Sequence, residues 1–509
     1  MAENNLLVVS DLHLSEGWNS ETGRVSRLES FHYDDAFERF IHHHESIRRS
    51  RRYKERPWLL IFNGDLFQFA QVVSLPPEGK ELRAVTGVSS YDELPRDVLR
   101  YGLGTTPKEA AWKVGRIAAG HPIFFAALGW FLAHGNRIAI IKGNHDPEWF
   151  WPEVQERFCR EILHAYEEWL IEGGSGPHLM LEDVQKRVRF YPWFYYEPGR
   201  IYVEHGHQYD PVNRFRNFLH PVQPHRPNHL DLPWGSFVTQ TFLNHLQRGF
   251  PYADLDELMK QQLGRAIRQS PVRAAAMGLY YLYLVARATL RELRQRRHAG
   301  EWEKFPFSTA RNVGLSVLPD AVVRRLIQMG WEPHHRAVER VLRIFARAGA
   351  ATATMLLQFV GIFQAARAFV DAEYLGMLGW AIMAGGVFLL RRSIQLYFRQ
   401  QVSRVHYGYE AVPYIRQALG EKYEVPYYVF GHMHRPTLRR LEGGKWFVDS
   451  GGWPILIRQQ LQRLEEKKLT FVRLPTGHRG APELLYWDDS GNKAERLVLV
   501  EPYQQDLAV

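Results

Sequence analysis

Five short polar clusters, each following an apolar run, constrain this chain more than any other feature. The clusters are Asp11-Leu12-His13, Gly64-Asp65, Gly143-Asn144-His145-Asp146, His205-Gly206-His207 and Gly431-His432-Met433-His434. The runs before them have the length and apolar content of buried strands, and they cover residues 6–10, 58–62, 137–142, 200–204 and 427–430. Polar residues that end such strands gather at the carboxyl edge of a sheet. The pattern therefore predicts an α/β protein with one site built from Asp, His and Asn side chains.

The residue types in these clusters indicate metal binding. Carboxylate and amide oxygens combined with imidazole nitrogens suit Mn²⁺, Zn²⁺ or Fe. Two such ions, about 3.5–4 Å apart, can hold a phosphoryl group between them. Each cluster alone is a weak signal, because Gly, Asn and Asp also favour turns. It is their joint occurrence at strand ends that predicts a metal-dependent hydrolase.

In the order D-x-H, G-D, G-N-H-D, H and G-H-x-H, the clusters resemble the motifs of the calcineurin-like metallophosphoesterases. This resemblance implies a four-layer α-β-β-α sandwich, with two mixed sheets flanked by helices. It also implies two divalent metal ions, Mn²⁺ in the first place and Zn²⁺ or Fe as alternatives. Motif by motif, one ion would be held by Asp11, His13, Asp65 and His434, and the other by Asp65, Asn144, His205 and His432. Asp65 would bridge the two ions, and a hydroxide between them would attack phosphorus in line.

Two further residues of the third cluster are predicted to take part in catalysis. His145 follows a ligand without being one, so it could protonate the leaving oxygen or hold the phosphate. Asp146 could orient His145 by accepting its second N–H.

Within the superfamily, the sequence is most similar to the UDP-2,3-diacylglucosamine hydrolases. The similarity rests on Gly64-Asp65-Leu66-Phe67, on Gly431 to Pro436, and on Asp210 and Asn213-Arg214-Phe215-Arg216 after His205. It differs at His145, where those hydrolases usually have Arg, and at Gln68, where an acid often stands. The similarity implies a lipid-linked or nucleotide-linked phosphate ester or pyrophosphate as substrate. A nuclease or cyclic-nucleotide phosphodiesterase is one alternative, and a membrane-associated scaffold with a vestigial site is another, although the complete ligand set argues against a scaffold.

The length of 509 residues exceeds that of one ordinary domain. The resemblance covers roughly residues 1–220 and 405–460. We therefore expect a phosphoesterase domain made of residues 1–213 and 405–509, with a loop insertion at about 71–115 and a helical stretch at 107–133. Residues 214–404 are rich in Leu, Ala, Arg and aromatic residues, which predicts a large helical insertion or lid.

Two apolar stretches in this insertion, 349–370 and 373–390, have Arg residues at their outer ends. A buried helical hairpin, a hairpin at the membrane interface and a two-helix span are all compatible with that pattern. The net charge of +9 and the Arg clusters suit an anionic membrane surface. Nucleic acid is a less favoured partner, because no nucleic-acid-binding motif is present. A single cysteine and the lack of a signal-like N-terminus predict a cytoplasmic protein, in part at the cytoplasmic face of the membrane. The oligomeric state is not predicted.

Overall fold

The computed structural model describes residues 4–20, 22–210, 212–244, 317–330, 407–453 and 469–497, with a few isolated positions besides. Contacts group the chain into two compact units, of which the first comprises Met1–Pro251, Glu301–Trp331 and Tyr407–Val500. Apart from Tyr280, Tyr283 and Arg287, the described residues belong to this first unit.

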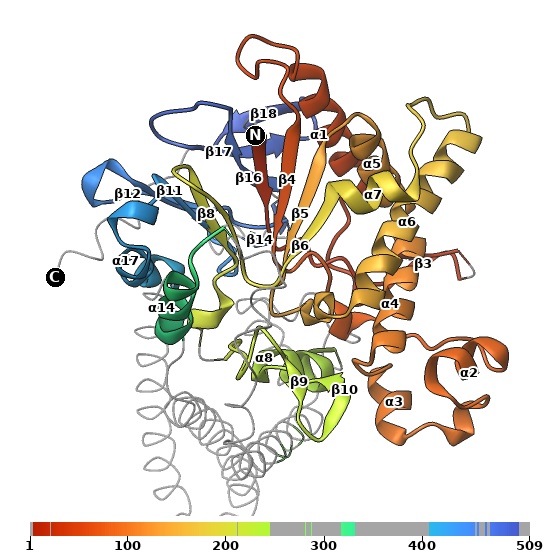
Figure 1. The fold of residues 1–509 in the computed structure, drawn as a ribbon. Helices are drawn as coiled ribbons and strands as arrows, with labels where there is room; N and C mark the ends of the chain where they lie inside the picture. The colour runs from red at the N-terminus through yellow and green to blue at the C-terminus, as the bar shows by residue number, and fades with distance from the viewer. Residues whose placement is uncertain are drawn as a thin grey trace, which may run out of the picture. The chain divides into compact units, whose positions relative to one another are not determined.

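Two mixed sheets form the centre of the first unit (Figure 1). In the larger sheet, β1 (Asn5–Val9) pairs in parallel with β4 (Trp58–Asn63), which is followed by β5 (Arg137–Ile141) and β6 (Val188–Tyr191), also parallel. On the other side of β1 three antiparallel strands complete the sheet: β16 (Leu469–Leu474), β17 (Glu483–Asp488) and β18 (Lys493–Arg496).

The smaller sheet has the order β12-β13-β11-β8-β7. Its central strands are parallel, namely β8 (Ile201–Glu204), β11 (Tyr427–Phe430) and β13 (Trp446–Asp449). Its edge strands, β7 (Phe194–Glu197) and β12 (Thr437–Arg440), are antiparallel to their neighbours.

Side chains alternate across the central strands and so contribute to different cores. In β1, Leu7 and Val9 belong to a core shared with helices, whereas Leu6 and Val8 belong to the core between the two sheets, which also contains Val203 of β8. A third core lies between the smaller sheet and its own helices. These three cores separate four layers, so the predicted α-β-β-α sandwich is confirmed.

Helices cover the outer face of each sheet. The core beneath the larger sheet contains Phe37 of α1 (Asp34–Ile47), Phe125 of α5 (Pro122–Ala133) and Phe158 of α6 (Pro152–Ile171). The core of the smaller sheet contains Leu326 of α14 (Asp320–Gly330) and Ile415 of α17 (Tyr407–Leu419).

The helical stretch predicted at 107–133 is two helices rather than one. The first helix, α4 (Pro107–Gly120), meets α5 at an angle of 95°. His121 separates the two helices, and Pro122 stands at the first position of α5, which suits its fixed φ and missing N–H. A Cβ on Gly120 would collide with the carbonyl of Glu16, so glycine lets the chain after His13 approach this bend closely.

The predicted loop insertion at about 71–115 is partly helical. It contains α2 (Lys80–Thr86), α3 (Arg96–Tyr101) and the first half of α4. Figure 1 shows α2 and α3 beyond α4, on the side away from the sheets. The stretch predicted as a loop is therefore helical in part.

Most of the predicted insertion, 214–404, lies outside the described residues, as do both apolar stretches at 349–370 and 373–390. Its first part forms a hairpin of β9 (Val222–Gln223) and β10 (Arg226–Leu230), then the short helix α8 (Trp234–Val238) and one π-helical turn, η5 (Thr239–Leu243). Among the described helices none alone is long and apolar enough to cross a membrane, and only the bent pair α4 and α5 passes such a test together.

Candidate metal centre

All five polar clusters follow strands whose carboxyl ends point to one edge of the sandwich. The first three follow β1, β4 and β5 of the larger sheet, and the last two follow β8 and β11 of the smaller sheet. Because each of these sets of strands is parallel, their ends bring residues far apart in sequence together.

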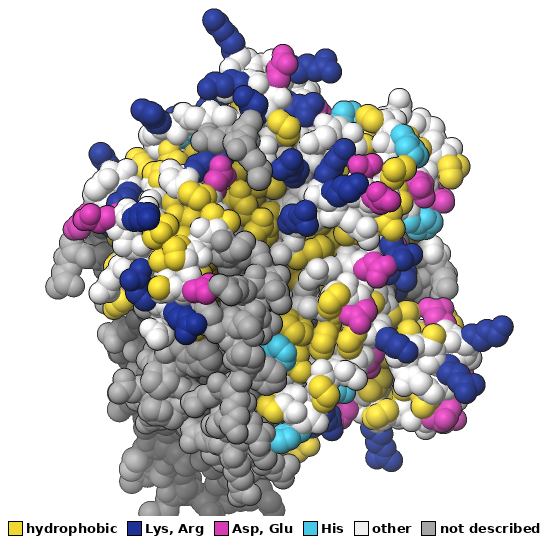
Figure 2. Space-filling model, in the orientation of Figure 1, with side chains coloured by type: hydrophobic (Ala, Val, Ile, Leu, Met, Phe, Trp, Pro, Cys, Tyr) yellow, Lys and Arg dark blue, Asp and Glu magenta, His cyan; other side chains and the backbone are white. Residues whose placement is uncertain are grey.

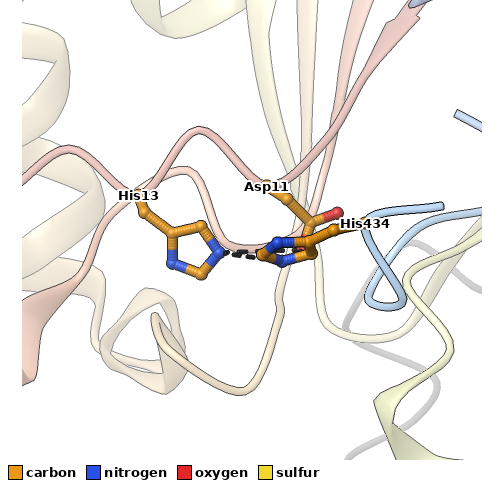
Figure 3. A group of neighbouring side chains, drawn as sticks. All are labelled: Asp11, His13 and His434. Carbon is orange, nitrogen blue, oxygen red and sulfur yellow. Dashed lines mark hydrogen bonds and ion pairs between the residues drawn. The ribbon is translucent and has the colours of Figure 1, made fainter. Parts of the chain in front are cut away.

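One group of side chains joins the first and last clusters: Asp11, His13 and His434 (Figure 3). Nε2 of His434 lies 3.0 Å from Oδ1 of Asp11 and 3.3 Å from Nε2 of His13. The other carboxylate oxygen of Asp11, Oδ2, accepts a hydrogen bond of 3.0 Å from the backbone N–H of His432. The backbone of the last cluster thus fixes Asp11 with Oδ1 directed at the two imidazoles.

A second group contains Asp65, His205 and His432. Oδ2 of Asp65 lies 3.1 Å from Nε2 of His205 and 3.9 Å from Nε2 of His13, so this single oxygen faces both groups. Oδ1 of Asp65 accepts a hydrogen bond of 2.8 Å from the backbone N–H of His145. Asp65 therefore lies between the two groups of side chains.

A backbone carbonyl orients the imidazole of His205. Its Nδ1 lies 2.7 Å from the carbonyl oxygen of Asn63, so Nδ1 carries a proton that it donates to this oxygen, and Nε2 is directed towards Asp65. Nε2 also lies 3.2 Å from Oδ1 of Asn144. Nδ2 of Asn144 is buried and has no hydrogen-bond partner among the described residues. Asn144 therefore joins the second group through its amide oxygen.

His145 lies beside the first group, with its ring centroid 5.1 Å from that of His13. Its Nδ1 is buried and has no hydrogen-bond partner within the described part of the chain. Burial, reinforced by the neighbouring histidines, lowers the pKa of His145 to about 3 despite the opposing charge of Asp65. The ring is therefore neutral at pH 7, and its Nδ1 is not engaged by the described residues.

Asp146 does not orient His145, contrary to the prediction from sequence. Its Oδ1 accepts a hydrogen bond of 2.7 Å from the N–H of Gly143, and its Oδ2 accepts from the amides of Leu66 (2.8 Å) and Phe67 (3.4 Å). The side chain points back into the loops, because the turn after β5 directs successive residues to different sides. Asp146 thus connects the third cluster to the chain after the second by hydrogen bonds to the backbone of both.

The glycines of three clusters stand where no side chain fits. A Cβ on Gly64 would collide with the imidazole of His205, and one on Gly143 with Oδ1 of Asp65. A Cβ on Gly431 would lie 2.9 Å from Oδ2 of Asp11 and closer still to Oγ of Ser10. Each glycine therefore makes room for a polar group of a different cluster.

The candidate ligands also have an unusual backbone. Eight non-glycine residues of the described chain have positive φ, a conformation that costs free energy for residues with a Cβ. Five of the eight are candidate ligands: Asp11, His13, Asp65, His432 and His434. Strain concentrated at these positions is typical of a functional site, where the surrounding structure enforces it.

Charge in the centre favours cations. Burial raises the pKa of Asp65, but His205 and His145 outweigh it and keep this pKa well below its usual range. Burial lowers the pKa of His205, but Asp65 and Asp11 more than offset it and raise this pKa to about 10. The carboxylates thus stabilise positive charge on the groups beside them. The donor set of carboxylate and amide oxygens with imidazole nitrogens fits a pair of divalent ions.

Two supporting residues escaped the sequence-based assignment of the site. Oδ2 of Asp210 lies 3.0 Å from Nε2 of His432. Glu29, only 4% exposed, accepts hydrogen bonds from Ser15 and Gly17 just after His13, and its carboxylate also contacts His121. The Asp210 position was visible in the spacing after His205, whereas nothing in the sequence around Glu29 marks it.

Comparison with protein families adds independent evidence. The model of the calcineurin-like phosphoesterases matches residues 5–262, just over half of the 509-residue chain. This range contains the first four clusters, and the structure brings the fifth, with His432 and His434, to the same place. Comparison with curated proteins finds no match. The chain belongs to the calcineurin-like phosphoesterase family, whose activity is metal-dependent hydrolysis of phosphoesters at a site for two divalent ions.

Proposed function

We propose that this enzyme hydrolyses a phosphate ester or pyrophosphate of a lipid-linked or nucleotide-linked substrate, as the UDP-2,3-diacylglucosamine hydrolases do. The main support for a site with two ions is the position of Asp65, whose Oδ2 faces both His13 and His205. The ligands assigned are Asp11, His13, Asp65 and His434 for one ion, and Asp65, Asn144, His205 and His432 for the other. The substrate class rests on the motifs of the sequence.

The ions, the two carboxylates and His145 would have different roles in the reaction. Divalent ions bound there would supply positive charge to the phosphoryl oxygens and lower the pKa of a water molecule. Asp11 and Asp65 are held by backbone amides, so they need not reorganise when substrate binds. Because its ring is neutral, His145 favours the second of its two predicted roles, donating a hydrogen bond to a phosphoryl oxygen.

Charge on the surface gives the membrane proposal limited support. Figure 2 shows Lys and Arg side chains spread among Asp and Glu over one face of the described residues, without one dominant basic area. An anionic membrane as partner, and a location at the cytoplasmic face, therefore rest on the net charge of +9 and on the apolar stretches of the sequence. Mn²⁺ as the physiological ion is part of the same proposal.

A substrate panel that includes one matched pair tests the proposal. Purified enzyme, stripped of metal and then supplied with Mn²⁺, Zn²⁺ or Fe²⁺, is assayed on a phosphate monoester, a phosphodiester, cyclic AMP, DNA and a nucleotide-linked lipid in mixed micelles. The last is paired with the same nucleotide sugar lacking acyl chains. We expect the acylated member to be hydrolysed faster, with Asp65→Asn inactive on all substrates. Equal rates on the matched pair would reject the lipid, and preference for DNA or cyclic AMP would support a nuclease or cyclic-nucleotide phosphodiesterase.

A vesicle experiment tests the membrane part separately. Full-length protein and a variant lacking 349–390 are mixed with anionic or neutral vesicles and sedimented at low and high salt. We expect salt-sensitive binding of the full chain to anionic vesicles and weaker binding of the deletion variant. Equal binding of both variants would reject a role for this segment at the membrane.

A further inference from the structure

The segment that follows His205 makes two contacts with candidate ligands. Oδ2 of Asp210 lies 3.0 Å from Nε2 of His432, and Oγ of Ser236 donates a hydrogen bond of 2.9 Å to the backbone carbonyl of Asn144. Both ligands belong to the same proposed set, the one that Asp65 and His205 complete. We call the described residues 207–210 and 212–244 the clasp segment.

The carboxylate of Asp210 is itself held in place. Its Oδ1 accepts a hydrogen bond of 2.9 Å from the N–H of Val212, and its Oδ2 accepts one of 2.7 Å from Nδ2 of Asn213 as well as facing His432. Asp210 is 8% exposed, so water competes little for these bonds. A fixed carboxylate at Nε2 makes that nitrogen the protonated one and leaves Nδ1 of His432 with its lone pair free for an ion.

Ser236 is buried and is connected to the same turn. The N–H of Gly235 donates a hydrogen bond of 3.0 Å to the carbonyl of Val212, and a Cβ on Gly235 would collide with Oδ1 of Asn213. The turn that carries Asp210 therefore packs directly on α8, which carries Ser236.

The clasp segment is anchored to three strand-end loops. It reaches the loop after β11 through Asp210 and the loop after β5 through Ser236. It also reaches the chain after β4, because Nδ2 of Asn244 donates a hydrogen bond of 2.6 Å to the carbonyl of Ala70. The segment thus holds together loops from both sheets that supply Asp65, Asn144 and His432.

We infer that Asp210 and Ser236 are positioning residues for one of the two ions, the one assigned to Asp65, Asn144, His205 and His432. Occupancy of this position depends on the clasp segment, whereas the ion at Asp11, His13 and His434 is held by the motif loops themselves. The inference rests on the proposed two-ion site. It adds that the two positions differ in what stabilises them.

Metal binding tests the inference without recourse to activity. Metal-free wild type, Asp210→Ala, Asp210→Asn and Ser236→Ala are titrated with Mn²⁺ by calorimetry, and paired ions are followed by electron paramagnetic resonance. Wild type should bind two ions with a spin-coupled signal. Asp210→Ala should keep one ion at wild-type affinity and bind the second about 10–100-fold more weakly, the usual effect of losing the group that orients a ligand. Ser236→Ala should shift the same ion in the same direction.

Two variants separate positioning from general damage. Asp210→Asn keeps an acceptor but removes the charge, so its second-ion affinity should lie between those of wild type and Asp210→Ala. Asp231→Asn changes another buried carboxylate of the clasp segment, which pairs with Arg216 at 2.9 Å, and should bind both ions as wild type does.

Three outcomes overturn the inference. Unchanged binding of two ions by Asp210→Ala would show that the contact with His432 does not matter. Equal weakening of both ions would show that Asp210 supports the whole centre. If wild type itself bound fewer than two ions, the proposed two-ion site would be wrong, and the inference would fail with it; this outcome is distinguishable because it appears in wild type.

Discussion

The backbone N–H of His145 donates a hydrogen bond of 2.8 Å to Oδ1 of Asp65. The two oxygens of this carboxylate therefore have different surroundings: Oδ1 is held by the third cluster, and Oδ2 faces His13 and His205. Asp11 repeats the arrangement, with Oδ2 held by the N–H of His432 and Oδ1 facing His434. Both carboxylates are thus aimed by a backbone amide of another cluster.

Replacing Asp65 with Asn should abolish hydrolysis and leave the fold intact. The amide oxygen of Asn can still accept from the N–H of His145, so the loop geometry is retained. The negative charge that both ions share is lost, and we expect turnover to fall by more than about 10²-fold, with weaker binding of both ions. Turnover, metal content and the thermal midpoint are measured together. Activity above about a tenth of wild type would contradict a bridging role for Asp65.

Replacing Gly143 with Ala should disturb the same oxygen from the other side. The added methyl group would collide with Oδ1 of Asp65 and push the carboxylate away from His145. We expect the metal content to fall, with stability reduced by about 1–3 kcal/mol, as for overpacking in a core. Gly79→Ala is the control: its φ of 95° makes Ala unfavourable, but no atom lies within 4 Å of the added Cβ. If both variants kept their metal, the glycine would not be required at Gly143.

The sequence was sufficient to predict the layers and the grouping of the candidate ligands, because both depend on short-range patterns. The apolar runs that became β1, β4, β5, β8 and β11 were recognisable by length and composition, and parallel pairing then places their polar ends together. The seven predicted ligands gather in the overlapping groups described above.

What the sequence did not reveal depends on contacts between distant residues. Asp146 was expected to orient its neighbour His145, but the turn directs it to the amides of Gly143 and Leu66. Pro122 marks the break between α4 and α5 locally, but the close approach of Glu16 to Gly120 at this bend has no local signal in the sequence. The pattern of apolar and polar residues predicts which helices and strands exist, whereas the direction of a side chain in a turn follows from tertiary packing.

Replacing His145 and replacing His205 should have different effects on metal. His205→Ala removes a nitrogen directed at Asp65, so metal content should fall. His145→Ala also removes an imidazole close to His13 and Asp65, but it leaves all seven assigned ligands in place, so metal should stay. Its turnover should fall by about 10²–10³-fold, the usual effect of losing a hydrogen-bond donor to the transition state. Elemental analysis decides, and equal loss of metal in both variants would make His145 a ligand.

The pH dependence of stability should report a buried ion-pair network below the site. His121 is buried, with Nε2 3.1 Å from Glu29 and Nδ1 3.0 Å from Asp34. Burial lowers the pKa of His121, but the two carboxylates outweigh it and raise this pKa to about 10. In the unfolded chain the pKa is about 6.5. The network's contribution is therefore fully present below about pH 6.5 and is lost as the pH rises towards 10.

His121→Gln should remove this dependence, because glutamine does not titrate, and should lower stability at pH 6 by about 3–5 kcal/mol, the usual cost of leaving a buried charge unpaired. Denaturant midpoints are compared at pH 6, 8 and 10 for wild type, this variant and His164→Gln, an exposed histidine of α6 that should behave as wild type. The difference between wild type and His121→Gln should shrink steadily from pH 6 to pH 10. A constant difference over that range would mean that His121 is not charged in the folded protein. Glu29 would then hold the chain after His13 only through the hydrogen bonds that it accepts from the N–H and hydroxyl of Ser15 and from the N–H of Gly17.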